Sequence, residues 1–227
     1  MKLILFDIDG TLLKAGAIVR DAMGDALEHV FGTRGGIIDA SFIGATDLGM
    51  IRKLMGNEGF TEVEIIQKFP ELIGLYGKML REKLASWDKF KLCPGVPAIL
   101  DKLKAEDVIL GLVTGNCQMG ALIKLEHAGL TEYFRFGAFG DESDNRTEIC
   151  RLSHKRGEAE AYQKIPKENL ILIGDSPNDI KAAHEYGIKV LALHSGWTPA
   201  EDLEALKPTW LYPDLSAKDK ILTLLLS

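Results

Sequence analysis

KLILF at residues 2–6 runs directly into DIDGT at residues 7–11, and this junction carries most of the information in the chain. The first five residues form an apolar run that is typical of a buried strand. The next five place two carboxylates, Asp7 and Asp9, in front of a glycine turn. Aspartate is rare in strands, and carboxylates this close repel each other unless a cation offsets their charge. The pattern therefore predicts a metal ion and a reaction at a strand end, the alternative being a polar strand end that enters a turn.

The composition limits the classes of protein that fit. The chain has 227 residues, of which 46% are hydrophobic, enough for one large domain or for one domain and a smaller one. A net charge of −6 disfavours a nucleic-acid binder. The chain shows no apolar run of membrane-spanning length and no signal-like N-terminus. Its three widely spaced cysteines indicate neither disulfides nor a zinc site. We expect a cytoplasmic protein, as a monomer or a homodimer.

Short apolar runs alternate with amphipathic stretches along most of the chain. This alternation predicts an α/β fold with a doubly wound parallel sheet, because strands buried on both faces read as continuous apolar runs. The expected strands lie at 3–6, 108–113, 136–139, 170–173 and 190–193, and the expected helices at 96–104, 118–128, 147–162 and 177–186.

One segment breaks the alternation. Residues 14–91 show helical periodicity without a convincing strand, and Thr61-Glu62-Val63-Glu64 has the form of a capping box. A structureless loop of this length is unusual in a compact domain. We therefore predict a helical cap at 14–91, inserted into a catalytic core formed by 1–13 and 92–227.

A second polar cluster follows the expected strand at 108–113. Thr114, Gly115 and Asn116 stand between that strand and a helix, where backbone N–H groups and the Thr114 hydroxyl could bind a phosphate oxygen. Ordinary turn chemistry explains the same three residues, so this cluster does not decide between the two interpretations by itself.

A third cluster, GDSPND at 174–179, follows the expected strand at 170–173. Ser176 and Pro177 fit the first positions of a helix, and Asp179 fits its first turn. Helix capping does not explain Asp175. Carboxyl ends of parallel strands lie at one edge of a sheet, so Asp175 is expected near Asp7.

Several carboxylates around a metal ion and a phosphate require a basic side chain nearby. Arg146 directly precedes an expected helix and could bind phosphate through two N–H groups. Lys155 is the alternative, but it lies well inside that helix. The sequence favours Arg146.

The motifs DIDGT, LVTGN, a basic residue and GDSPND, in this order, resemble those of the haloacid dehalogenase superfamily, and more narrowly of its phosphoglycolate-phosphatase-like branch. The resemblance covers the whole chain, including the helical cap. It implies a phosphatase, because dehalogenases attack carbon and do not need an acid at the position of Asp9.

The resemblance also implies roles for the residues. Asp7 would be the nucleophile that becomes an aspartyl-phosphate, and Asp9 the general acid and then the base. The Asp7 carboxylate, the Asp9 carbonyl and Asp175 would hold Mg²⁺. Asp179 would support Asp175 or Arg146. The residues that would bind phosphate are Thr114, Gly115, Asn116 and Arg146.

The cap is expected to recognise the substrate, a small phosphorylated metabolite. In the loop at 43–47, glycine and polar residues interrupt the helical pattern, and Thr46 and Arg52 are candidate specificity residues, of which Arg52 could contact an anionic leaving group. The alternative is that Thr46 and Asp47 only cap the next helix and Arg52 is a surface charge. Trp197 and Trp210 are expected to be packing residues, although Ser195, Gly196 and Trp197 follow the expected strand at 190–193 and could border the site.

The same residues also fit two other functions. A sugar phosphomutase of the same fold would return the phosphoryl group to a sugar instead of to water. A phospho-acceptor receiver protein also gathers aspartates and a threonine at a sheet edge, but it has no insertion after its first strand. The identity of the phosphomonoester is not readable from the sequence.

Overall fold

A computed structural model describes residues 1–40 and 44–227. Its main feature is a six-stranded sheet in the order β5-β4-β1-β6-β7-β8, in which each neighbouring pair is parallel. This arrangement confirms the predicted doubly wound α/β fold. The strands are β1 (Lys2–Phe6), β4 (Val108–Val113), β5 (Gly137–Ala138), β6 (Leu170–Gly174), β7 (Lys189–Leu193) and β8 (Trp210–Tyr212).

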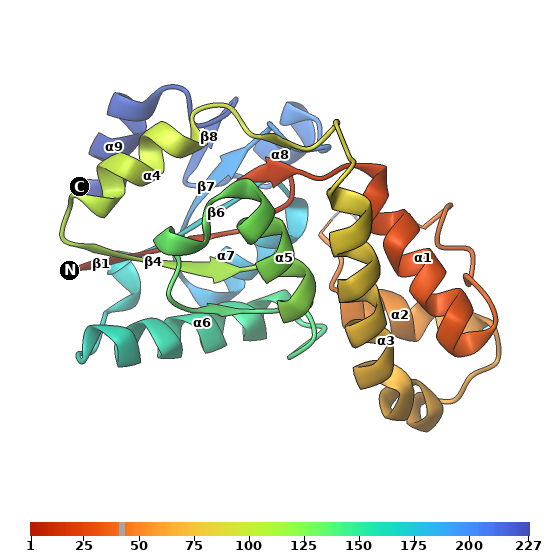
Figure 1. Ribbon diagram of the computed structural model, residues 1–227. Helices are drawn as coiled ribbons and strands as arrows, with labels where there is room; N and C mark the ends of the chain where they lie inside the picture. The colour runs from red at the N-terminus through yellow and green to blue at the C-terminus, as the bar shows by residue number, and fades with distance from the viewer. Residues whose placement is uncertain (41–43) are drawn as a thin grey trace.

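Side-chain alternation along β1 divides the core into two layers. Ile4 and Phe6 pack in the cluster that contains helices α4 (Val96–Lys104), α5 (Gln118–Ala128) and α9 (Lys218–Leu226). Leu3 and Leu5 pack in the opposite cluster, formed with α6 (Arg146–Ala161), α7 (Pro177–Tyr186) and α8 (Ala200–Ala205). Both faces of the sheet are therefore covered (Figure 1), which explains why its strands are almost wholly apolar.

Three helices form a separate group beyond one end of the sheet (Figure 1). They are α1 (Ala17–Phe31), α2 (Asp47–Asn57) and α3 (Glu62–Leu84), and they share an apolar cluster of their own. The capping box predicted at Thr61 and Glu64 is present at the start of α3. Cys117 and Ile123 near α5 join the same apolar cluster, so this group also packs against the core.

A short antiparallel ribbon connects the two parts. Strand β2 (Leu13–Lys14) pairs with β3 (Lys91–Leu92), and both ends of the inserted segment pass through it. The predicted division into a cap at 14–91 and a core at 1–13 and 92–227 falls inside this ribbon. We keep the names cap and core for these two segments.

The expected helices at 96–104, 118–128 and 177–186 agree with α4, α5 and α7, and the expected helix at 147–162 begins one residue earlier. The sequence patterns did not indicate β8, α8 or α9, nor the 3-10 turns η1 (Thr131–Tyr133) and η2 (Lys167–Asn169). Within the described residues, no helix has the length and apolar character needed to cross a lipid bilayer.

Candidate active site

Three of the predicted polar residues follow adjacent strands. Asp7 follows β1, Thr114 follows β4 and Asp175 follows β6. Since these strands are parallel neighbours, their carboxyl ends lie at one edge of the sheet. The backbone N–H of Asp7 donates to the Ile173 carbonyl at 2.9 Å, which fixes the start of the DIDGT loop against β6.

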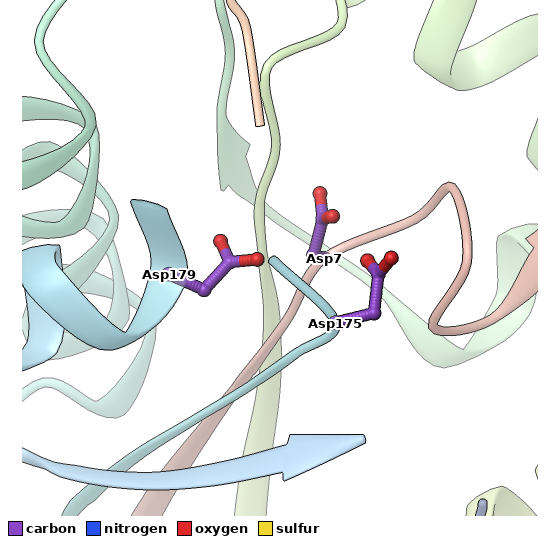
Figure 2. A group of neighbouring side chains, drawn as sticks. All are labelled: Asp7, Asp175 and Asp179. Atoms are coloured by element: carbon purple, nitrogen blue, oxygen red, sulfur yellow. The ribbon is translucent and has the colours of Figure 1, made fainter. Parts of the chain in front are cut away.

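Asp7, Asp175 and Asp179 bring one carboxylate oxygen each to within 4.8 Å of one another. Figure 2 shows the three carboxylates side by side, two at strand ends and Asp179 in the first turn of α7. All three are buried. Burial and proximity together concentrate negative charge at this point of the sheet edge.

Arg146 is the basic residue that reaches this group. Its Nη2 lies 3.0 Å from Asp7 Oδ1 and 2.8 Å from Asp179 Oδ1, and its Nε donates to the same Asp179 oxygen. Nη1 is buried and has no hydrogen-bond partner among the described residues. Lys155, the alternative cation, is exposed on α6. The geometry thus favours Arg146 as the cation of the site.

The buried charges change the ionisation of the group. Burial raises the pKa of Asp7 to about 7, and repulsion from Asp179 and Asp9 adds to this effect although Arg146 opposes it. Burial also raises the pKa of Asp175 well above its ordinary value, helped by repulsion from Asp7. Burial by itself would lower the pKa of Arg146, but the Asp179 and Asp7 carboxylates outweigh burial and raise it.

The residues fit a divalent metal ion. The donors are carboxylate oxygens, which hard cations prefer, and Arg146 alone does not compensate the three buried acids. Asp179 Oδ2 accepts hydrogen bonds from the N–H and hydroxyl of Ser176, and its Oδ1 is engaged by Arg146. Asp7 and Asp175 are therefore the carboxylates with the greater capacity to bind a metal.

Two glycines make room for the Asp175 carboxylate. A Cβ atom at Gly10 would lie 2.3 Å from Asp175 Oδ2, and a Cβ atom at Gly196 would lie 1.6 Å from it. Gly196 follows β7, and the neighbouring Ser195 hydroxyl donates to the Gly10 carbonyl at 2.8 Å. The position of Gly196 after an expected strand indicates that it could border the site, but the sequence does not reveal its contact with Asp175.

Two residues of the predicted phosphate-binding cluster, Thr114 and Asn116, make different contacts. Thr114 is fully buried and lines the cavity, and its Oγ1 accepts hydrogen bonds from the backbone N–H and the side-chain amide of Asn116. The Asn116 amide also donates to Asp9 Oδ2 at 2.8 Å. The side chain of Asn116 is thus engaged with Asp9, and its predicted role in binding phosphate stays a prediction.

Lys124 is a residue of the site that no sequence motif indicated. Its side chain is 1% exposed, and its Nζ lies 2.6 Å from Asp9 Oδ2 and 2.5 Å from Asn116 Oδ1. Helical spacing gave a signal, since Lys124 stands three residues after the buried Ala121 on α5. A lysine in a helix that contains no motif is usually a surface charge, so the sequence does not mark Lys124 as a site residue.

A cavity of about 440 Å³ opens at this edge of the sheet, between core and cap. Its lining includes Asp7, Asp9, Thr114 and Arg146 from the core. The cap contributes several residues to the same lining: Gly16, Ala17, Val19, Arg20, Gly44, Ala45, Thr46, Asp47 and Met50. The candidate catalytic side chains therefore face a space that the cap partly encloses.

The two cap specificity candidates behave differently. Thr46 lines the cavity and is also the N-cap of α2, where its hydroxyl accepts a hydrogen bond from the Gly49 N–H. Arg52 is not among the described residues of the lining, and it pairs with Asp144 and Glu62 instead. Its contact with a leaving group stays a prediction. Ile43, in the same predicted loop, lies outside the described residues.

The expectation that Trp197 is a packing residue is wrong. The side chain is 51% exposed and lines the cavity, which agrees with the alternative that residues 195–197 border the site. The Lys14 ammonium lies 5.6 Å from the centre of its ring. Trp210, in contrast, packs against the apolar cluster of the core as expected.

Direct hydrogen bonds hold the cap against the core beside the cavity. The N–H of Asp47 donates to the Gly115 carbonyl at 2.7 Å, and Asp47 Oδ2 accepts from the Cys117 N–H at 2.7 Å. The Asn178 side-chain amide donates to the Gly44 carbonyl at 2.7 Å. Burial raises the pKa of Asp47. These contacts describe a cap that lies closed on the site.

Comparison with known proteins agrees with this geometry. The model of the haloacid dehalogenase-like hydrolase family matches residues 4–193. A phosphoglycolate phosphatase from Rhodobacter capsulatus is 24% identical over 215 residues, covering 94% of this chain and 93% of the relative. The crystal structure of a predicted phosphoglycolate phosphatase from Haemophilus somnus superimposes with a TM-score of 0.69 at 24% identity, covering 98% of each chain. A putative β-phosphoglucomutase from Thermotoga maritima gives a TM-score of 0.63 at 20% identity, covering 99% of each chain.

The chain belongs to the haloacid dehalogenase-like hydrolase family, as its motifs led us to expect. Within that family it resembles the phosphoglycolate phosphatases along almost its entire length.

Proposed function

We propose that this protein is a Mg²⁺-dependent phosphomonoester hydrolase that acts through an aspartyl-phosphate on Asp7. The observation that carries the proposal is the pairing of Asp7 with Arg146 inside the cavity, at 3.0 Å. A nucleophilic carboxylate beside a buried guanidinium suits attack on a phosphoryl group, because the guanidinium offsets the charge that both partners bring together.

Arg146 and Thr114 would hold the phosphoryl group. Arg146 Nη1 is a buried donor without a hydrogen-bond partner among the described residues, and a phosphate oxygen in the cavity would satisfy it. The Thr114 hydroxyl already accepts from Asn116, so its proton is available to a second oxygen. With the phosphoryl group fixed in this way, the Asp7 carboxylate attacks phosphorus and the bond to the leaving oxygen breaks.

Asp9 would donate a proton to the departing alkoxide and then accept one from the water that attacks the aspartyl-phosphate. Its side chain lines the cavity beside Asp7 and is 27% exposed, which leaves it in reach of both. The Asp7 carboxylate, the Asp9 carbonyl and Asp175 would bind Mg²⁺, which supplies charge neutralisation for the phosphoryl group. Asp179 would orient Arg146.

The substrate is proposed to be a small phosphorylated metabolite, phosphoglycolate-like or a sugar phosphate. A cavity of about 440 Å³ partly closed by the cap suits a small molecule better than a phosphoprotein. Relatives along the whole chain are phosphoglycolate phosphatases, and Arg20 provides a cap residue of positive charge in the lining. Both features support a leaving group that carries an anionic or polar substituent.

A sugar phosphomutase is the second candidate, because a putative β-phosphoglucomutase shares the fold. The two activities use the same nucleophile and differ in what accepts the phosphoryl group. Membership in the hydrolase family removes the support for a receiver protein. The proposed activity requires no nucleic-acid or membrane partner.

The test is a phosphate-release screen with Mg²⁺ over a panel of phosphoglycolate, sugar phosphates, nucleoside monophosphates and pyrophosphate. The proposal predicts release from at least one small phosphomonoester and loss of release when the metal is chelated. Sugar-phosphate isomers without free phosphate would establish the mutase instead. Release from none of the esters would refute the proposed hydrolase.

A further inference from the structure

Lys124 occupies an unusual place for a lysine. It projects from the middle of α5 with 1% of its side chain exposed, and none of the family motifs contains it. Burying an ammonium group is unfavourable unless strong partners compensate, so a lysine is almost never buried without a charged or polar partner. Its contacts therefore indicate what the buried charge does.

Both contacts of Lys124 lead to the same carboxylate. The ammonium lies 2.6 Å from Asp9 Oδ2 and 2.5 Å from the side-chain oxygen of Asn116. An ammonium group can only donate, so Asn116 must turn its oxygen toward Lys124 and its NH₂ group away. That NH₂ group donates to Asp9 Oδ2 at 2.8 Å.

Lys124 and Asn116 thus form a three-membered network with one oxygen of Asp9. Oδ2 receives a donor from each of them, and neither of these contacts involves Oδ1. A carboxylate at the end of a short side chain can otherwise rotate about two bonds. Fixing Oδ2 from two directions sets both rotations and determines where Oδ1 lies.

We propose that Lys124 is a positioning residue that, through Asn116 and directly, holds Asp9 so that Oδ1 faces the oxygen of the leaving group. The inference rests on the proposed phosphatase function. In the step concerned, the bond from phosphorus to Asp7 forms, the bond from phosphorus to the ester oxygen breaks, and a proton passes from Asp9 to that oxygen. Lys124 also lines the cavity, and in this assignment it acts through Asp9 and not on the phosphoryl group or the leaving group.

The proposal predicts a dependence on the leaving group that a purely structural role would not produce. An alkoxide leaves poorly and needs a well-placed acid, whereas 4-nitrophenolate leaves readily without one. The values of kcat/KM for the two esters report the step in which the leaving group departs. A fault in the position of Asp9 should therefore affect the alkyl ester much more than the aryl ester.

The experiment compares wild type with Lys124→Met, using phosphoglycolate, or the best alkyl ester of the panel, and 4-nitrophenyl phosphate, both with Mg²⁺. Methionine fills a similar volume without charge, and the Asp9 side chain is 27% exposed, so the carboxylate left without its partner keeps contact with solvent. We expect kcat/KM to fall by about 100-fold or more for the alkyl ester and by less than about tenfold for the aryl ester. Equal losses for both esters, or no loss, would overturn the inference.

A double-variant comparison tests whether Lys124 acts through Asp9. In the Asp9→Asn background, adding Lys124→Met should change kcat/KM for the alkyl ester by less than about twofold, because the group it positions is already lost. A further loss as large as that in the wild-type background would overturn the inference. Asn116→Ala is the second variant if Lys124→Met does not fold, and the same selective loss is expected.

The outcomes separate this inference from the proposed function. If the wild-type protein releases phosphate from no ester, the proposed function fails and the inference fails with it. If the wild-type protein is active and the Lys124 variant loses activity equally on both esters, the phosphatase proposal stands and only the positioning role is refuted. A Glu126→Gln variant, exposed on the same helix, should leave the ratio of the two esters unchanged.

Discussion

Arg146 shows how much a single residue contributes to this site. It is the buried cation beside Asp7 and Asp179, and its Nη1 is a buried donor without a hydrogen-bond partner among the described residues. The sequence identified it only from its position before a helix and from the need for positive charge. Its ion pairs with two acids could be identified only from the structure, because 139 residues separate it from Asp7 along the chain.

We predict that Arg146→Ala lowers kcat/KM by about 100-fold or more, since both phosphate binding and charge neutralisation are lost. It should also destabilise the protein, by about 3–5 kcal/mol, because two buried carboxylates lose their partner. Phosphate-release kinetics and denaturant unfolding measure the two effects. Lys155→Ala is the control, and a larger loss in that variant than in Arg146→Ala would reverse the assignment.

The raised pKa of Asp7 predicts how stability depends on pH in the absence of metal. The folded protein binds a proton on Asp7 up to about pH 7, whereas an unfolded aspartate releases it near 3.8. Unfolding in this window releases a proton, so the stabilisation present at low pH is lost as the pH rises from about 4 to about 7. The Tm of the metal-free protein should therefore respond to pH more steeply in wild type than in Asp7→Asn.

Mg²⁺ should flatten this dependence in wild type, because the ion binds the ionised carboxylates and offsets their repulsion. Thermal unfolding between pH 4.5 and pH 8, with chelator and with Mg²⁺, tests both points. Identical pH dependence of Tm in wild type and Asp7→Asn would contradict the assignment of the raised pKa to Asp7.

At the scale of elements, the loops after the strands build the site, and they were predicted unevenly. DIDGT after β1 and GDSPND after β6 carry dense patterns of acids and turn residues, and both were identified from sequence. The loop after β7 offers only Ser195, Gly196 and Trp197, whose meaning depends on what lies opposite them. Since Gly196 acts by lacking a side chain next to Asp175, its position after a strand indicates only that it could border the site and does not indicate which residue it contacts.

We predict that Gly196→Ala weakens metal binding by tenfold or more, about 1.4 kcal/mol or above, by displacing the Asp175 carboxylate. Calorimetric titration with Mg²⁺ gives the affinity directly. Gly74→Ala in α3 is the matched control, since a Cβ atom there meets nothing within 4 Å and alanine favours a helix. Unchanged affinity in Gly196→Ala would show that Asp175 does not bind the metal in the position it has here.

At the scale of the whole molecule, the sequence predicted the α/β core and the helical insertion better than their interface. Periodicity reveals apolar faces, and it therefore located α1, α3 and most core helices. It does not reveal which polar groups meet across two parts of the chain. The sequence indicates that Asp47 helps Thr46 to cap a helix, but the Asp47 carboxylate accepts a hydrogen bond from the Cys117 N–H of the core. The sequence left Arg52 between a contact of the leaving group and a surface charge, and it did not indicate the ion pairs with Asp144 and Glu62.

Cap closure gives a prediction that involves both parts. Asp47→Ala should lower kcat/KM by about tenfold or more, because a partly buried hydrogen bond to a carboxylate contributes about 1.5 kcal/mol or more to the closed arrangement. Arg52→Ala removes only partly exposed ion pairs and should change kcat/KM by less than about twofold. A large rise in KM for Arg52→Ala would instead support its predicted contact with the leaving group.

The central claim is that Asp7 takes the phosphoryl group covalently, and acid quenching during turnover tests it most directly. The protein is mixed with a radiolabelled phosphomonoester from the panel and Mg²⁺, quenched, digested and mapped. We predict label on the peptide that contains Asp7, and neither label nor phosphate release in Asp7→Asn, whose near-isosteric side chain should leave the fold intact. Label on another residue, or near wild-type phosphate release by Asp7→Asn, would contradict the account.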